Sequence, residues 1–209
     1  MGKARSKAVA AEPESHVRWR VDVIAVGASA GGFPALIELL HALARDAPAV
    51  LVVQHLDPNR KSLLAGLLAH KTTRNVRQAD AGDPIVPGVI YVCPPDEHML
   101  VAATGIELSH SELVHFSRPS IDLLFESVAG RFGNRAMGVI LSGSNSDGAF
   151  GIRAIREAGG TTLAQSPATA EFRTMPQAAI DTGCIDFVVP LDKLGDEIMR
   201  LCAENHRNS

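Results

Sequence analysis

Ser29 stands at the centre of a glycine-rich turn in the stretch VGASAGG, residues 26–32. A turn of this kind between a strand and a helix can hold a phosphate on its backbone N–H groups. It can also expose a serine hydroxyl as a nucleophile, and residues 27–31 match the G-x-S-x-G pattern of such a turn. The motif is weak alone, because a serine here could simply cap the following helix.

The phosphate interpretation fits the sequence poorly. A dinucleotide site requires G-x-G-x-x-G and an acidic residue at the end of the second strand. Here Ser29 replaces the second glycine, and the second strand ends in Gln54-His55. No lysine is present in the turn, as a Walker A loop would require. We therefore predict no cofactor, and a loose mononucleotide site is kept as an alternative because helix N-termini attract anions.

The nucleophile interpretation needs a base and a group that orients the base. His55 directly follows the apolar run 49–54, and Asp147 lies in the loop SGSNSDG after the apolar run that begins at 136. Ligands of open α/β sheets bind beyond the carboxyl ends of the strands, so these residues should share one rim with Ser29. We predict a catalytic Ser29–His55–Asp147 triad.

Each partner of Ser29 also has a structural interpretation. His55 could be a strand-end histidine that bonds a backbone carbonyl. Asp147 could cap the helix that follows it or form an Asp-Gly turn. The joint occurrence of all three residue types at strand ends favours catalysis. The chain order Ser…His…Asp is no objection, since triads recur in unrelated orders.

Apolar runs of about six residues alternate along the chain with helical patterns, which is typical of a parallel sheet covered on both faces. The short runs 89–92 and 99–103 predict an antiparallel hairpin. The fold class expected is therefore α/β: a doubly wound, mostly parallel, Rossmann-like sheet with an antiparallel β-hairpin. The strands expected are 21–26, 49–54, 136–143, 161–165 and 185–189, and the helices are 33–44, 62–71, 119–132, 147–160, 176–182 and 191–204.

Composition limits the classes of partner. The chain has 209 residues, 46% of them apolar, and a formal net charge of -3, so it lacks the cationic excess that a nucleic-acid partner requires. Its three cysteines form no C-x-x-C pair, so we predict neither a disulfide framework nor a metal site. No apolar run approaches the ~20 residues of a bilayer span, so we expect no membrane insertion and a cytoplasmic location. Residues 1–20 and 204–209 are expected to be tails around one domain over 21–203.

Several blocks of the sequence resemble a known family, the chemotaxis protein-glutamate methylesterases of the CheB family. The blocks are IAVGASAGG, VVQHLDP, VIYVCPPDEHM, FSRPSIDLLFESVA, GVILSGSNSDGAFGIRAIREAGGTTLAQ and TMPQAAIDTGCIDFVV, in this order. The resemblance covers about residues 21–203. It implies hydrolysis of glutamate methyl esters on the cytoplasmic helices of methyl-accepting chemoreceptors, and in many members deamidation of glutamine. It places the family's triad on Ser29, His55 and Asp147.

Two positions depart from the family's usual pattern. Its serine turn usually reads GASTGG, and Ala30 stands here in place of the threonine. Its aspartate loop usually reads TGMGNDG, and Ser144 takes the methionine position. We expect the backbone N–H groups near Ala30 and Ser144 to hold the oxyanion. Only about twenty residues precede the first strand, so no receiver domain is expected.

Other polar residues have weaker claims to the site. Arg118 and Ser120 could line the mouth of the cleft, although Ser120 could equally have a structural role at the start of the helix that follows it. His98 and Met99 could line the cleft or simply pack the hairpin. A rival function of another class is a receptor-docking module that binds methylatable helices without hydrolysing them.

Overall fold

The structure is a computed structural model that describes residues 19–57, 62–114 and 116–203. Its strands are β1 Val23–Ala28, β2 Ala49–Gln54, β3 Asn75–Gln78, β4 Val89–Val92, β5 His98–Ala102, β6 Gly105–Ser109, β7 Ala136–Ile140, β8 Thr161–Gln165 and β9 Phe187–Val189. Its α-helices are α1 Gly32–Ala42, α2 Leu64–Ala69, α3 Ile121–Phe132, α4 Ala149–Glu157, α5 Thr174–Asp181 and α6 Leu191–Ala203, and a 3₁₀ turn spans Gly133–Arg135.

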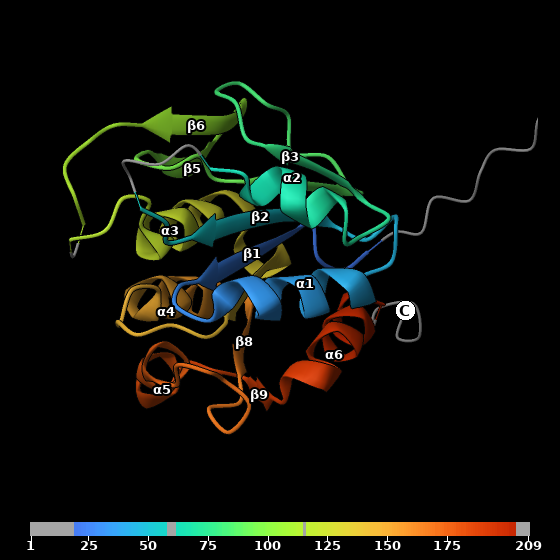
Figure 1. The fold of residues 1–209 in the computed structure, drawn as a ribbon, viewed down its shortest axis with the longest axis vertical. Helices are drawn as coiled ribbons and strands as arrows, with labels where there is room; N and C mark the ends of the chain where they lie inside the picture. Colours follow the sequence, from blue (N-terminus) through green and yellow to red (C-terminus); the bar gives the residue numbers. More distant parts are fainter. Residues whose placement is uncertain (1–18, 58–61, 115, 204–209) are drawn as a thin grey trace, which may run out of the picture.

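Seven of these strands form one parallel sheet in the order β3-β4-β2-β1-β7-β8-β9. From β1 the chain forms β2 beside it and then the edge strand β3, and it returns to place β4 between β3 and β2. It then crosses to the other side of β1 with β7. The strand order therefore reverses at β1, and because the pairing is parallel, the carboxyl ends of β2, β1 and β7 lie at one edge of the sheet. Figure 1 shows β1 and β2 running in the same direction. Such a reversal is where open α/β sheets bind ligands. The predicted fold class is confirmed.

Two apolar clusters cover the two faces of the sheet. On one face, α1, α2 and α6 pack against the strands, with Leu36, Leu39 and Ile198 fully buried. On the other face lie α3, α4, α5 and the β5–β6 hairpin, with Phe125 and Met99 fully buried. Figure 1 shows α1 and α6 on the side of the sheet opposite α3 and α4. Burial on both faces explains why the central strands are continuous apolar runs.

The predicted hairpin pairing was wrong. Residues 89–92 form β4, which lies between β2 and β3 in the parallel sheet and is buried along its whole length. The hairpin instead pairs β5 with β6, and Ala102 lies opposite Gly105 across a tight turn. The continuous apolar run VIYV, with no alternation, was the signal of a parallel strand. The edge strand β3, with the sequence NVRQ, is only partly buried and has no apolar pattern to reveal it.

The two predicted tails, 1–20 and 204–209, lie outside the described residues except for Trp19 and Arg20. Trp19 packs against the apolar cluster beneath α1 and α6, and its ring N–H donates to the Asp46 carbonyl at 2.9 Å. The Arg20 N–H donates to the Cys202 carbonyl at 3.0 Å. The two ends of the described domain therefore meet at its surface beside α6.

Gly27 near the end of β1 makes room for α3. A methyl group added at Gly27 would overlap the side chain of the fully buried Ile121. Gly27→Ala should lower the free energy of unfolding by about 1–3 kcal/mol, the usual cost of overpacking a core. Urea unfolding measures the change. The control is Gly66→Ala in α2, where an added methyl group meets open space and should stabilise the helix by up to about 1 kcal/mol. Equal stability of Gly27→Ala and the parent protein would contradict this packing.

Candidate active site

Three polar side chains from neighbouring strands form a chain of hydrogen bonds at the carboxyl edge of the sheet. Ser29 follows β1, His55 follows β2, and Asp147 lies in the loop between β7 and α4. The Ser29 Oγ is 3.1 Å from His55 Nδ1, and His55 Nε2 is 2.9 Å from Asp147 Oδ2. The structure thus brings together the three residues that the sequence placed on one rim. Such a chain can pass a proton from the hydroxyl to the ring.

The turn that carries Ser29 is hydrogen-bonded to the neighbouring β7–α4 loop. The Ser29 N–H donates to the Ser142 carbonyl at 2.9 Å, and the Ser142 hydroxyl donates to the Ala30 carbonyl at 2.8 Å. Gly31, the N-cap of α1, lies in the left-handed region with a φ of 68°, which glycine adopts without strain. Ser29 does not cap α1, because Gly31 is the capping residue, and among the described residues no side chain caps the helix start. The serine side chain is therefore left for His55.

Gln54, the last residue of β2, holds the backbone on both sides of the serine–histidine pair. Its side-chain N–H donates to the Ser29 carbonyl at 2.7 Å and to the His55 carbonyl at 3.0 Å. This side chain also fills the space beside Gly32, where a Cβ atom would overlap it. From the sequence, Gln54 indicated only that an acidic residue is missing at the end of β2. Its role depends on where its amide points, which contacts between distant segments decide.

The Asp147 carboxylate is held by the first turn of α3. The N–H groups of Ile121 and Asp122 donate to it at 2.8 and 3.0 Å, and the Ser120 hydroxyl donates at 3.1 Å. Helix N-termini favour negative charge, and bonds to a charged group are worth about 1.5–3 kcal/mol each. Asp147 does not cap α4, the helix that follows it, because Gly148 is the capping residue there. Its carboxylate instead accepts hydrogen bonds from the N-terminus of α3, which lies earlier in the chain.

These contacts decide the charge of Asp147 and the tautomer of His55. Burial opposes ionisation of Asp147, but the hydrogen bonds from His55 and from the Ile121 and Asp122 N–H groups together hold its pKa below the ordinary value. Asp147 is thus an anion and accepts the Nε2–H of His55. In the neutral ring, the lone pair of Nδ1 then faces Ser29, which is the arrangement that a general base requires.

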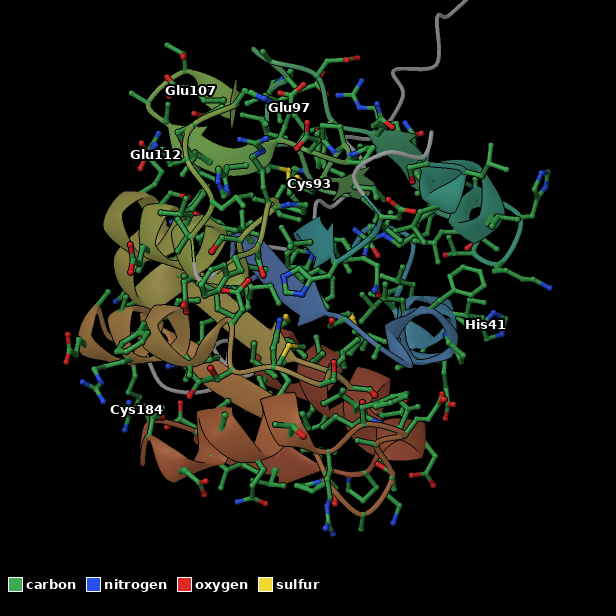
Figure 2. The ribbon with its side chains drawn as sticks, turned by 60° about the vertical axis from the view of Figure 1, so that its left-hand side comes forward. His41, Cys93, Glu97, Glu107, Glu112 and Cys184 are labelled. Carbon is green, nitrogen blue, oxygen red and sulfur yellow. The ribbon has the colours of Figure 1, made fainter. Side chains whose placement is uncertain are left out.

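Ser120 and His98 connect the β5–β6 hairpin to the start of α3. Ser120 is fully buried and caps α3, so it does not line the cleft mouth. Its backbone N–H donates to His98 Nδ1 at 3.1 Å, and His98 Nε2 donates to the Glu112 carbonyl at 3.0 Å. His98 and Met99 are fully buried, so packing of the hairpin explains them better than cleft lining. Figure 2 shows Glu112 on this side of the molecule, together with Glu97 and Glu107.

The two positions expected to hold an oxyanion lie in adjacent turns. Ala30 follows Ser29 directly, and Ser144 is exposed in the β7–α4 loop. Within the described parts of the chain, neither backbone N–H has a hydrogen-bond partner. Both therefore remain available as donors to a ligand. The Ser29 N–H is excluded from this role because it already bonds the Ser142 carbonyl.

Ser29 borders two hollows in the surface. One has a volume of about 430 Å³ and lies between the start of α1 and α2. Its apolar lining consists of Phe33, Pro34, Leu56, Leu63, Leu64 and Leu67. The other, of about 360 Å³, is bordered by His55, Asn145, Phe116 and Arg118, and Arg118 is paired with Asp96 at 2.7 Å. Leu63 and Phe116 are 70% and 97% exposed, so both hollows have apolar rims.

The cysteines form no disulfide bonds in the part of the chain that the structure describes. The cysteines Cys93, Cys184 and Cys202 are free, and Figure 2 shows Cys93 and Cys184 in different parts of the molecule. Burial raises the pKa of the Cys202 thiol to about 12, which leaves it uncharged. Over the same described ranges, no three His, Cys, Asp or Glu side chains gather as a metal site would require. No described helix combines the length and apolar character needed to cross a bilayer.

Fold and site together define a class: α/β proteins with a serine, a histidine and an aspartate linked at the switch point of a parallel sheet. Comparison with known proteins gives the particular family. Residues 24–198 match the family described as CheB methylesterase. The chain therefore belongs to the CheB methylesterase family, as its sequence blocks indicated.

Individual relatives support this membership. The chain is 38% identical over 199 residues to a protein-glutamate methylesterase/protein-glutamine glutaminase of Anaeromyxobacter dehalogenans, covering 93% of this chain and 56% of that protein. A putative protein of the same description from Leptospira interrogans is 36% identical over 186 residues. The match covers 88% of this chain and 96% of that protein. The solved CheB methylesterase catalytic domain of Thermotoga maritima superposes with a TM-score of 0.84 at 28% identity, covering 87% of this chain and 98% of that one. The chain spans about half the length of the first curated relatives that it matches.

A second carboxyl group, that of Asp122, lies buried behind Asp147. Its Oδ1 accepts the Gly151 N–H at 2.7 Å, while Oδ2 is buried without a partner among the described residues. Burial raises the pKa of Asp122 to about 6; the hydrogen bond from Gly151 opposes this, and the nearby charge of Asp147 adds to it. A raised pKa in the folded state means that protonation of Asp122 favours folding.

The stabilisation from protonating Asp122 is complete below its ordinary pKa of 3.8 and is lost as the pH rises through about 6. Asp122→Asn keeps an acceptor for Gly151 and cannot ionise. Relative to the parent protein, its free energy of unfolding should therefore rise by on the order of 2 kcal/mol between about pH 4 and pH 7. Urea unfolding at several pH values measures this difference. The control Glu38→Gln, at an exposed position of α1, should change stability by less than about 0.5 kcal/mol throughout. A constant difference for Asp122→Asn would contradict the raised pKa.

Proposed function

We propose that this chain is a serine hydrolase that removes methyl esters from glutamate side chains of methyl-accepting chemoreceptors, with Ser29 as nucleophile, His55 as base and Asp147 as the group that orients the base. The observation that carries this proposal is the unbroken hydrogen-bond chain from Ser29 Oγ through His55 to the buried Asp147. Membership of the CheB methylesterase family supports the reaction class.

In the first half-reaction, Ser29 Oγ attacks the ester carbonyl carbon while its proton passes to His55 Nδ1. Asp147 stabilises the imidazolium through Nε2–H, and its own bonds to α3 keep it an anion throughout. The backbone N–H groups of Ala30 and Ser144 hold the oxygen that becomes negative. As the carbonyl reforms, the bond to the methoxy oxygen breaks. The Nδ1 proton goes to that oxygen, and methanol leaves.

In the second half-reaction, water attacks the glutamyl ester on Ser29. His55 Nδ1 takes a proton from this water and returns it to Ser29 Oγ as the bond to the serine breaks. The products are the free enzyme and a glutamate side chain, whose acid proton is lost to solvent. A glutamine side chain could follow the same steps with ammonia as the leaving group, which matches the glutaminase named in the relatives' descriptions.

The two hollows beside Ser29 suit a helical protein substrate. An amphipathic helix exposes apolar side chains one turn before and after a central residue. A glutamate ester at the centre would reach Ser29, while its apolar neighbours would enter the hollow lined by Phe33, Leu64 and Leu67. The cytoplasmic helices of chemoreceptors are therefore the proposed partner. No membrane insertion is proposed, because the substrate helices lie in the cytoplasm.

Ser29→Ala should lower methanol release by on the order of 10⁴-fold or more, because the acyl-enzyme forms on the Ser29 hydroxyl. The assay uses receptor fragments carrying labelled methyl esters and counts volatile label. The control is Ser146→Ala, an exposed serine in the loop before Asp147, which should retain activity. Undiminished release by Ser29→Ala would overturn the mechanism. Binding of methylated fragments by the parent protein without any release would instead favour the docking module.

A further inference from the structure

Two hydrogen-bond donors face a single nitrogen of His55. The Ser29 hydroxyl lies 3.1 Å from Nδ1, and the side-chain Nδ2 of Asn145 lies 3.2 Å from the same atom. The other ring nitrogen, Nε2, is bonded to Asp147 and carries the proton when the ring is neutral. Nδ1 then offers one in-plane lone pair, with which two donors cannot both be well aligned. The two donors therefore compete.

A second contact fixes which end of the Asn145 amide faces His55. Its Oδ1 accepts the backbone N–H of Asp147 at 3.3 Å. If the amide were rotated by 180°, its NH₂ group would face the Asp147 N–H. Both groups are donors, so this hydrogen bond would be lost. Nδ2–H rather than Oδ1 is thus directed at the histidine. Asn145 is partly buried and borders the hollow that also contains Ser29 and His55.

We propose that Asn145 is a positioning residue that restrains the His55 base, by donating its side-chain N–H to Nδ1 in competition with the Ser29 hydroxyl. This inference rests on the proposed function of the site. While Asn145 holds the lone pair, Ser29 has no acceptor for its proton and is a poor nucleophile. Because Nδ1 must receive that proton during the attack, the Asn145 N–H must leave Nδ1 before the proton arrives.

The other charged groups of the described residues around His55 do not make this contact. Asp147 faces Nε2, on the opposite edge of the ring. Asp96 and Arg118 are paired with each other in the wall of the smaller hollow, and Asp57 borders the larger one. Asn145→Ala removes both the donor to His55 and the acceptor for the Asp147 N–H. Asn145→Asp keeps that acceptor, so comparison of the two variants separates the lost donor from the lost acceptor.

The first test detects the hydrogen bond itself and needs no enzymatic activity. In the ¹⁵N-labelled full chain, an N–H···N bond gives a scalar coupling between Asn145 Nδ2 and His55 Nδ1. The coupling should be present in the parent protein and larger in Ser29→Ala, where the competing hydroxyl is gone. A His55→Gln variant identifies the histidine signals. Absence of the coupling in both proteins would overturn the proposal, whatever reaction the enzyme catalyses.

The second test measures the reactivity of Ser29 with a fluorophosphonate probe, which reacts with activated serines and needs no receptor. Asn145→Ala should raise the labelling rate at alkaline pH by about two- to tenfold, the effect of losing one ordinary hydrogen bond. Asn145→Asp keeps the acceptor for the Asp147 N–H but replaces the donor with a carboxylate oxygen. It should favour the protonated ring, so that labelling rises only at higher pH than in the parent protein.

The exposed Ser146→Ala is the matched control and should label like the parent protein. An unchanged or lower rate for folded Asn145→Ala, or an unmoved pH profile for Asn145→Asp, would overturn the role of Asn145. A parent protein that the probe does not label at Ser29 would overturn the proposed function itself. In that case the coupling between the two nitrogens would still decide whether Asn145 occupies the base.

Discussion

The site depends on one interaction, the capture of the Asp147 carboxylate by the first turn of α3. A buried carboxylate is costly unless its oxygens are bonded, and here two backbone N–H groups, the Ser120 hydroxyl and His55 share them. This capture keeps the aspartate charged, which in turn fixes the histidine tautomer and directs a lone pair at Ser29. The first turn of α3 therefore determines which histidine nitrogen accepts from Ser29, although α3 does not bond that hydroxyl.

The start of α3 is itself held in place by elements that have no direct contact with Ser29. The hairpin strand β5 supplies His98, which accepts the Ser120 N–H and bonds the segment after β6 through Glu112. Packing of the hairpin against α3 thus has a function beyond burying apolar surface. Two polar contacts within this largely apolar interface, from the Ser120 N–H to His98 and from the Val101 N–H to the Ser127 hydroxyl, select one position of the helix along the hairpin. The hairpin therefore supports the site by holding the start of α3 in place.

The sequence was sufficient to predict the fold class and the three residues that meet at the sheet edge, because both follow from the rule that carboxyl ends of parallel strands share one rim. It failed at β4, where a short apolar run was paired with the wrong neighbour, and at β3, whose edge position requires no apolar residues. It also missed Gln54 and Asn145. Their roles depend on where an amide points, and only tertiary contacts between distant segments decide that. The composition and spacing of these residues carry no such information.

One buried side chain, that of Ile121, lies against the two segments that carry Ser29 and Asp147. The same methyl group of Ile121 lies nearest, or nearly so, to both Gly27 and Gly148, where an added Cβ atom would overlap or crowd it. Ile121 therefore couples the end of β1 to the start of α4, and a larger side chain at 121 would crowd both glycines. A smaller residue at 121 would make room for a side chain at 27. At 148 the crowding by Ile140 and the φ of 96° would remain, so a smaller residue at 121 would not open that position. The backbone around this site can thus vary at 27 more readily than at 148, although neither side chain would take part in the chemistry.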